Sequence, residues 1–197
     1  MIEYYPNTYN NFKCPKCNRK LKLNDKVVSG MRVLADLHCN NCQDEYWGDF
    51  PVGHGVNYSF YFSKKDKKVY SENYNWYSNL FKKTIESKDK SSEDIKIRIL
   101  KEVKKNEKAV LLNCLDNYYG HIILKLLNSQ FYLDNFTDYD LIVIIPKFLT
   151  WMVPEEVNNI IEVDISLRKS YMWIDDLNQY VEEFIDKYKK TYLSKAY

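Results

Sequence analysis

The chain of 197 residues carries 29 basic and 27 acidic side chains, and 45% of its residues are hydrophobic. These values are ordinary for a globular protein and exclude a wholly disordered or fibrous chain. Its apolar runs are far shorter than the roughly 20 residues that a membrane-spanning helix needs. The N-terminal residues lack the basic head and apolar stretch of a signal peptide. We therefore expect a cytoplasmic protein with no membrane span and one or two domains.

Two Cys-x-x-Cys pairs stand near the N-terminus, Cys14 with Cys17 and Cys39 with Cys42. Zinc takes four thiolates in a tetrahedron, and each pair can point two sulfurs at one centre. A hairpin about 20 residues long would bring the pairs together. Disulfides are the weaker interpretation, because nothing secretory accompanies the chain. The spacing predicts a four-cysteine zinc ribbon whose Zn²⁺ is structural, because a closed site leaves no position for water.

Short strands are predicted around the ribbon. Residues 20–28 and 31–37 favour a strand pair, and residues 46–51 favour a further strand. Residues 57–62 and 69–74 predict a β-hairpin with a lysine-rich tip. Aromatic side chains beside lysines could stack on single-stranded nucleic acid. A small aromatic sheet is favoured instead, because four thiolates and Zn²⁺ leave the ribbon negative.

The segment 82–108 is rich in Lys, Ser, Glu and Asp. Residues 91–94 resemble a helix start, and Ile95, Ile99 and Val103 follow at helical spacing. Isoleucines at every second position from residue 95 also fit a strand. We favour an amphipathic helix that links two domains.

An alternation of strands and helices is predicted in the C-terminal half. In chain order we expect strand 109–116, helix 121–133, strand 141–146, a helix opened by Pro154, strand 162–167, helix 175–190 and strand 191–197. Strands that are apolar on both faces and alternate with helices indicate a parallel sheet. The predicted fold class is α/β. A zinc ribbon with a small antiparallel sheet occupies residues 1–85, and a Rossmann-like βαβαβ domain occupies residues 86–197.

Polar residues cluster where the first of these strands ends. Ligands bind at the carboxyl ends of parallel strands, which is where Asp116 stands. His121 follows at a helix start, and the free amides of such a start favour an anion. We predict His121 as a general base steered by Asp116. The predicted substrate contacts are Asn117, Tyr119 and Gly120. An equally supported alternative is that Asp116 only caps the turn and His121 is surface.

Other candidate motifs are assigned structural roles. Asp138 and Asp140 match the Asp-x-Asp spacing of metal-dependent sugar transferases, but they precede a strand, so we expect a turn. Cys114 is expected to be a small buried residue. Residues 151–153 are expected to pack in the core rather than to line a cleft. Neither a Walker sequence nor Gly-x-Gly-x-x-Gly is present.

The sequence Asn-Cys-Leu-Asp-Asn-Tyr-Tyr-Gly-His at residues 113–121 resembles the first βα unit of GT-B-type glycosyltransferases with a Gly-His turn. The Ile-Pro strand and the terminal Tyr-Leu-Ser-Lys are similar to the passage toward their second domain. The resemblance covers residues 109–197. It implies sugar transfer from a nucleotide-sugar to a sugar or glycan acceptor, without an obligatory metal. A histidine or carboxylate would be the base, and a second domain would hold the donor.

Two functions therefore remain open. One is a glycosyltransferase-like protein that supplies the acceptor-side domain. The alternative is a non-enzymatic zinc-ribbon protein that contacts nucleic acid or a protein. Nucleic acid is not favoured, because the basic residues of the middle segment are balanced by an acidic C-terminal half.

Overall fold

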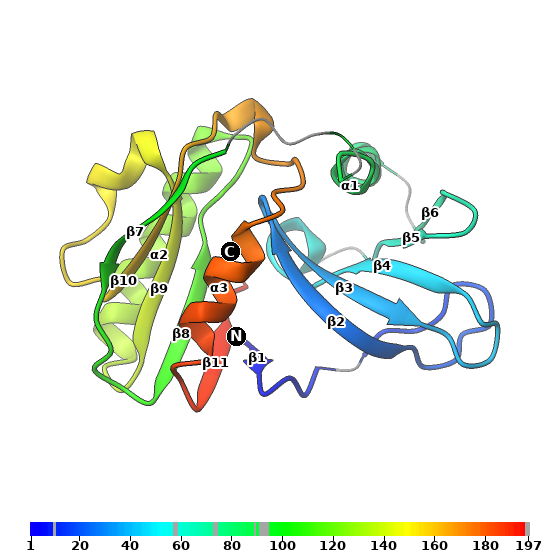
Figure 1. Cartoon of the computed structure of the whole chain (residues 1–197), viewed down its shortest axis with the longest axis horizontal. Coiled ribbons are helices and arrows are strands. Elements are labelled where there is room, and N and C mark those ends of the chain that lie inside the picture. The colour runs from blue at the N-terminus through cyan, green and yellow to red at the C-terminus, as the bar shows by residue number, and fades with distance from the viewer. Residues whose placement is uncertain (10, 57–58, 73–74, 89, 91–94, 196–197) are drawn as a thin grey trace.

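A computed structural model describes the chain except for residues 10, 57–58, 73–74, 89, 91–94 and 196–197 (Figure 1). Two sheets lie side by side. The five-stranded sheet is antiparallel with the order β2-β3-β4-β5-β6. Its strands are β2 (Lys22–Ser29), β3 (Arg32–His38), β4 (Glu45–Asp49), β5 (Tyr61–Ser63) and β6 (Val69–Tyr70). The antiparallel sheet expected beside the ribbon is therefore present, although parts of the predicted hairpin lie outside the described residues.

Helix α1 (Trp76–Glu86), which was not predicted from the sequence, covers one face of this sheet. Asn75 caps the helix, because its side chain accepts from the amides of Tyr77 and Ser78. Phe81 packs with Phe60 in a separate aromatic cluster of the core. The capping box formed by Asn75 and Ser78 was therefore the sequence signal for this helix, and it is masked by the composition of the segment around it.

The second sheet has six strands in the order β1-β11-β8-β9-β10-β7. The strands are β1 (Ile2–Tyr5), β11 (Lys190–Leu193), β8 (Lys108–Asn113), β9 (Asp140–Pro146), β10 (Asn159–Val163) and β7 (Ile97–Glu102). The four central strands are parallel, as predicted. The two edge strands are antiparallel, so the sheet is mixed and not the purely parallel sheet expected.

The helix predicted between the domains is wrong, because residues 97–102 form strand β7. Burial alternates along this strand, with Ile97 and Ile99 against the core and Leu100 exposed. The alternation of isoleucines was thus the stronger signal. The expected helix start at residues 91–94 lies outside the described residues.

The helix predicted after Pro154 is also wrong. A short 3₁₀ helix, η2 (Lys147–Met152), follows β9, and β10 begins at Asn159. Val153 is extended, as the residue before a proline prefers to be. The chain then makes a single turn, in which the amide of Val157 donates to the carbonyl of Pro154 at 3.1 Å. The Asn159 side chain accepts from the amide of Val103 at 3.0 Å, at the start of β10. The third predicted strand therefore ends at Val163 rather than continuing to residue 167, and η3 (Leu167–Lys169) follows.

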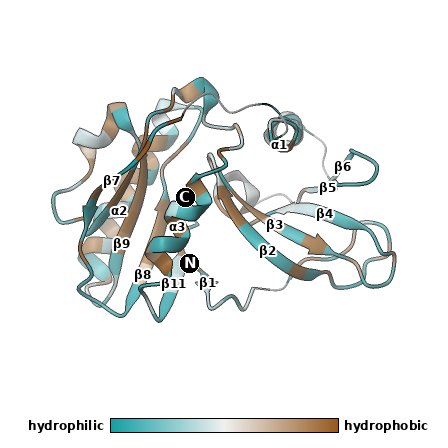
Figure 2. Cartoon of the chain, in the orientation of Figure 1, coloured by the Kyte–Doolittle hydropathy of each residue, from teal (hydrophilic) through white to brown (hydrophobic). Residues whose placement is uncertain are grey.

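The six-stranded sheet is covered on both faces (Figures 1 and 2). On one face, Val110 and Leu112 of β8 pack against α2 (Tyr119–Asn135). On the other, Ala109 and Leu111 join a core shared with α3 (Leu177–Ile185) and the five-stranded sheet. Helix α2 therefore lies on the side remote from the five-stranded sheet.

The turn between β2 and β3 ties the two sheets together. Gly30 adopts φ +53° there, and its carbonyl accepts from the Asn113 side chain at 2.9 Å. A Cβ at Gly30 would lie 2.5 Å from the carbonyl oxygens of Ser170 and Met172, so glycine is required. Ser29 accepts from the amide of Ile174 at 2.7 Å. The five-stranded sheet thus reaches the carboxyl end of β8. The boundary between two domains at residue 85 remains a prediction.

Candidate metal centre and sheet-edge site

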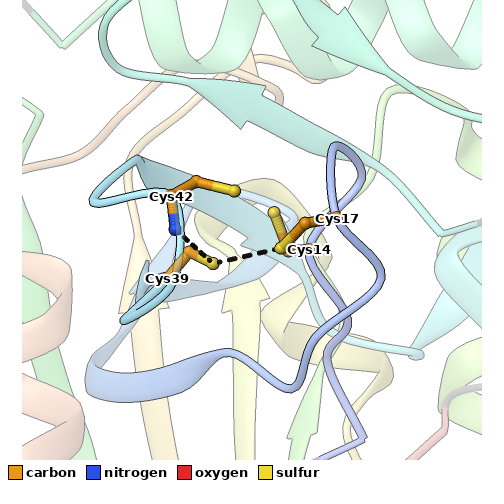
Figure 3. Close-up of side chains that lie close together, drawn as sticks. All are labelled: Cys14, Cys17, Cys39 and Cys42. Atoms are coloured by element: carbon orange, nitrogen blue, oxygen red, sulfur yellow. Dashed lines mark hydrogen bonds between the residues drawn. The ribbon is translucent and has the colours of Figure 1, made fainter.

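The four cysteines of the two Cys-x-x-Cys pairs lie on two matching turns. In the first turn the amide of Asn18 donates to the carbonyl of Cys14 at 2.8 Å. In the second, the amide of Gln43 donates to Cys39 at the same distance. Asn18 and Gln43 both adopt φ 58°, so the two turns share one backbone conformation. Each turn presents its two sulfurs to the same side (Figure 3).

The sulfur geometry fits a tetrahedral metal ion. All four Sγ atoms lie within 4.8 Å of one another, and those of Cys17 and Cys39 are 3.6 Å apart. Four sulfurs at about 2.3 Å from Zn²⁺ would be separated by roughly 3.8 Å. The amide of Cys42 donates to the Cys39 sulfur at 3.4 Å. The Arg19 amide, followed by contacts with the other cysteines, lowers the pKa of Cys17 to about 6, while the contact with Cys17 raises the pKa of Cys42. The cluster can therefore bind a metal ion as thiolates.

The sheet-edge site begins one turn beyond β8, at Asp116. This carboxylate is 2% exposed and lies 2.9 Å from the Lys125 ammonium and 3.1 Å from His121 Nδ1. The amide of Tyr118 donates to it at 3.1 Å. Burial opposes its ionisation most strongly, but Lys125, the Tyr118 amide and His121 together outweigh burial and hold the pKa of Asp116 below its ordinary value. Asp116 is thus a buried carboxylate shared by a lysine and a histidine.

The other side chains of the predicted site, those of His121, Tyr119 and Asn117, do not all lie around Asp116. His121 lies in the first turn of α2, with its side chain 30% exposed and its ring centroid 5.2 Å from that of Tyr118. Tyr119 is 49% exposed, and its hydroxyl lies 3.8 Å from the Met152 sulfur. The side-chain oxygen of Asn117 is buried with no hydrogen-bond partner among the described residues. Asp116 and His121 are therefore brought together, whereas Tyr119 contacts η2.

A small cavity lies at the point where the strand order of the six-stranded sheet reverses. The chain runs from β8 through β9 to β10 and then returns to place β11 on the other side of β8. Ligands of open α/β sheets bind at such a switch point. The cavity formed there by described residues measures about 20 Å³, and its walls include Asn113, Asp116 and Tyr77. That volume is room for roughly one water molecule.

A second buried cluster, which the sequence analysis missed, lies at the junction of the sheets. Arg32 is 1% exposed and lies 2.5 Å from Asp49 and 2.7 Å from the Tyr77 hydroxyl. Its Nη2 atom has no partner among the described residues. Burial raises the pKa of Asp49 to about 6 against the attraction of Arg32. No local motif marks these residues, because they come from β3, β4 and α1.

The predicted structural roles of Cys114 and Asp140 agree with their surroundings, whereas that of Trp151 does not. Cys114 is fully buried, as predicted, and burial raises the pKa of its thiol to about 12. Asp140 is buried at the start of β9 and accepts from the Lys105 amide at 2.7 Å, which is a structural role. The expectation of core packing is wrong for Trp151, which is 78% exposed on η2. None of the helices in the described part of the chain has the length and apolar content that a membrane span requires.

Comparison with known proteins gives one relative. No protein-family model matches the chain, and no solved structure matches it. The SPbeta prophage-derived uncharacterized protein YotC of Bacillus subtilis (strain 168) is 31% identical over 65 residues. These residues are 33% of this chain and 89% of the relative. The chain belongs to the family of this prophage-derived protein.

Proposed function

We propose that Cys14, Cys17, Cys39 and Cys42 hold one structural Zn²⁺. The close approach of all four sulfurs supports this proposal. Two thiolate pairs suit zinc better than the hard cations, which prefer oxygen. With four protein ligands the ion would have no open position, so it would hold the two turns together and not activate water.

We propose further that the carboxyl end of β8 is a catalytic site in which His121 removes a proton from a hydroxyl. The observation that carries this is the contact of His121 Nδ1 with the buried Asp116 carboxylate at 3.1 Å. An ionised Asp116 can only accept, so Nδ1 donates and Nε2 becomes the basic position. A buried carboxylate also stabilises the imidazolium that forms when Nε2 takes a proton.

Sugar transfer is the proposed reaction. The acceptor hydroxyl would lose its proton to His121, its oxygen would bond to the anomeric carbon of the donor, and the nucleoside diphosphate would leave. A nucleotide-sugar needs a pocket of roughly 300–1,000 Å³. The cavity beside Asp116 measures about 20 Å³. The proposal therefore requires the donor to bind outside this cavity, with only the acceptor hydroxyl reaching the edge.

Replacement of His121 by alanine tests the catalytic proposal. We expect nucleoside diphosphate release from a panel of UDP-, GDP- and dTDP-sugars, with monosaccharide acceptors, to fall about 100-fold or more. The thermal transition should change little, because Asp116 keeps its contact with Lys125. Gln130→Ala, further along α2 and exposed, is the matched control. An unchanged rate in His121→Ala, or no release by the wild-type chain, would reject the proposal.

A hollow beside the ribbon supports a second candidate function, which is binding without catalysis. It measures about 410 Å³ and is lined by Tyr61, Tyr70 and Lys13 next to Cys14. Its volume is within the range of ligand pockets. Two nearby lysines are already paired, since Lys16 lies 3.0 Å from Asp44 and Lys64 lies 2.7 Å from Asp36. This charge balance favours a protein segment over nucleic acid.

Salt-dependent binding of a fluorescent single-stranded oligonucleotide tests this choice. We expect no measurable binding at physiological salt, because lysines paired with carboxylates release few counterions. Fluorescence anisotropy across a salt series is the measurement. Tight binding that weakens steeply with salt would overturn the preference for a protein ligand.

A further inference from the structure

The outward face of α2 is apolar and uncovered. Leu124, Leu127 and Phe131 are 52%, 64% and 52% exposed, although they lie on a helix whose opposite face is in the core. Four more exposed side chains extend from the N-terminal end of α2, where the Tyr119 hydroxyl lies 3.8 Å from the Met152 sulfur of η2. They are the N-cap residue Tyr118, Tyr119, and Phe148 and Trp151 of η2. We name these seven residues the α2 patch. Apolar patches of this kind mark interaction surfaces in globular proteins.

The α2 patch carries no charge that would repel a copy of itself. Lys125 and Asp134 are the only Lys, Arg, Asp or Glu residues of α2. Lys125 points inward to Asp116, and Asp134 lies in the last turn. In an antiparallel pair of α2 helices, each Asp134 would approach the positive N-terminal end of the other helix. The charges of this face are therefore complementary to a second copy.

The spacing of the exposed residues is self-complementary as well. Gly120, Leu124, Leu127 and Phe131 follow at intervals of four, three and four residues, which puts them on one stripe of the helix. Reversing the helix about the midpoint of this stripe places Leu124 opposite Leu127 and Gly120 opposite Phe131. A Cβ at Gly120 would meet nothing within 4 Å. The open space at Gly120 therefore suits a phenylalanine from a facing copy.

We propose that two copies of this chain form a symmetric dimer through antiparallel α2 helices. The exposed parts of the patch present an apolar area on the order of 700 Å². A stable interface buries about 800 Å² per partner, so the patch and its polar rim suffice. Trp151 and Phe148 would cover the C-terminal end of the facing α2. This inference does not depend on the proposed chemistry at His121.

Sedimentation of the zinc-loaded full chain tests the dimer. At micromolar concentration we expect a mass of twice 23.7 kDa for the wild-type chain. Leu127→Glu should weaken association by about 100-fold or more, because each copy would bury a carboxylate without a partner. Leu100→Glu places the same change on an exposed leucine of β7 and should leave the dimer intact. Zinc content and thermal transition verify that each variant is folded.

A charge-swap experiment tests the antiparallel register. Leu124→Glu and Leu127→Lys should each be monomeric alone, and their equimolar mixture should regain the dimer mass, because residue 124 of one copy faces residue 127 of the other. A monomeric wild-type chain, a Leu127→Glu variant that stays dimeric, or a mixture that stays monomeric would each overturn the proposal. Neither experiment measures sugar transfer, so a failure of the dimer proposal leaves the catalytic proposal at His121 unaffected.

Discussion

Replacing Cys39 by serine is expected to abolish metal binding and to unfold the five-stranded sheet. Structural Zn²⁺ binding is worth about 10–16 kcal/mol in small zinc modules, which is comparable to the ~5–15 kcal/mol stability of a whole domain. Cys39 and Cys14 are also fully buried in the core that both sheets share. Loss of the ion should therefore reach beyond the two turns. Zinc content and the thermal transition, measured together, report both effects.

Cys114→Ala is the matched control for this experiment. Cys114 is fully buried but lies in the core against α2, outside the four-cysteine cluster. We expect this variant to retain one zinc ion per chain. A wild-type chain without zinc, or a Cys39→Ser variant with an unchanged transition, would contradict the assignment of the four cysteines.

The parts of the structure that the sequence predicted are those encoded by neighbouring residues. The metal cluster follows from spacing within two short turns, and each turn closes through a bond from the residue after its second cysteine. Asp116 and His121 are likewise five residues apart, so one strand end and one helix start suffice to bring them together. The buried parallel strands were recognisable because both of their faces are apolar.

The parts that were wrong depend on distant partners. Strands β7 and β10 contain apolar spacings that fit a helix or a strand. The pairing of β7 with β10, and of β10 with β9, decides the outcome. Strand β1 exists because β11, from the other end of the chain, offers it an edge. Lys125 is buried only because its ammonium pairs with the buried Asp116 carboxylate, and nothing in the helix sequence indicates this partner. Such contacts have no local signal.

Arg32→Met is expected to destabilise the protein by about 3–5 kcal/mol near neutral pH, because it leaves the Asp49 carboxylate buried without a counter-charge. Methionine can still pack where the guanidinium lies over the Tyr77 ring, 4.3 Å from its centroid. The loss is therefore electrostatic and not a cavity. Urea unfolding near pH 5 and near pH 8, compared with the wild-type chain, measures it.

The pH dependence of this variant follows from the carboxyl group that remains. Burial already raises the pKa of Asp49 to about 6, and removal of Arg32 can only raise it further. Between the unfolded value of about 3.9 and this raised value, the folded chain binds a proton that the unfolded chain releases, so stability falls as pH rises. Arg32→Met should therefore recover much of its stability near pH 5. Asp49→Asn removes the carboxyl group that binds this proton, so it should show no such recovery. Equal losses for Arg32→Met at both pH values would mean that Asp49 is not the group left unpaired.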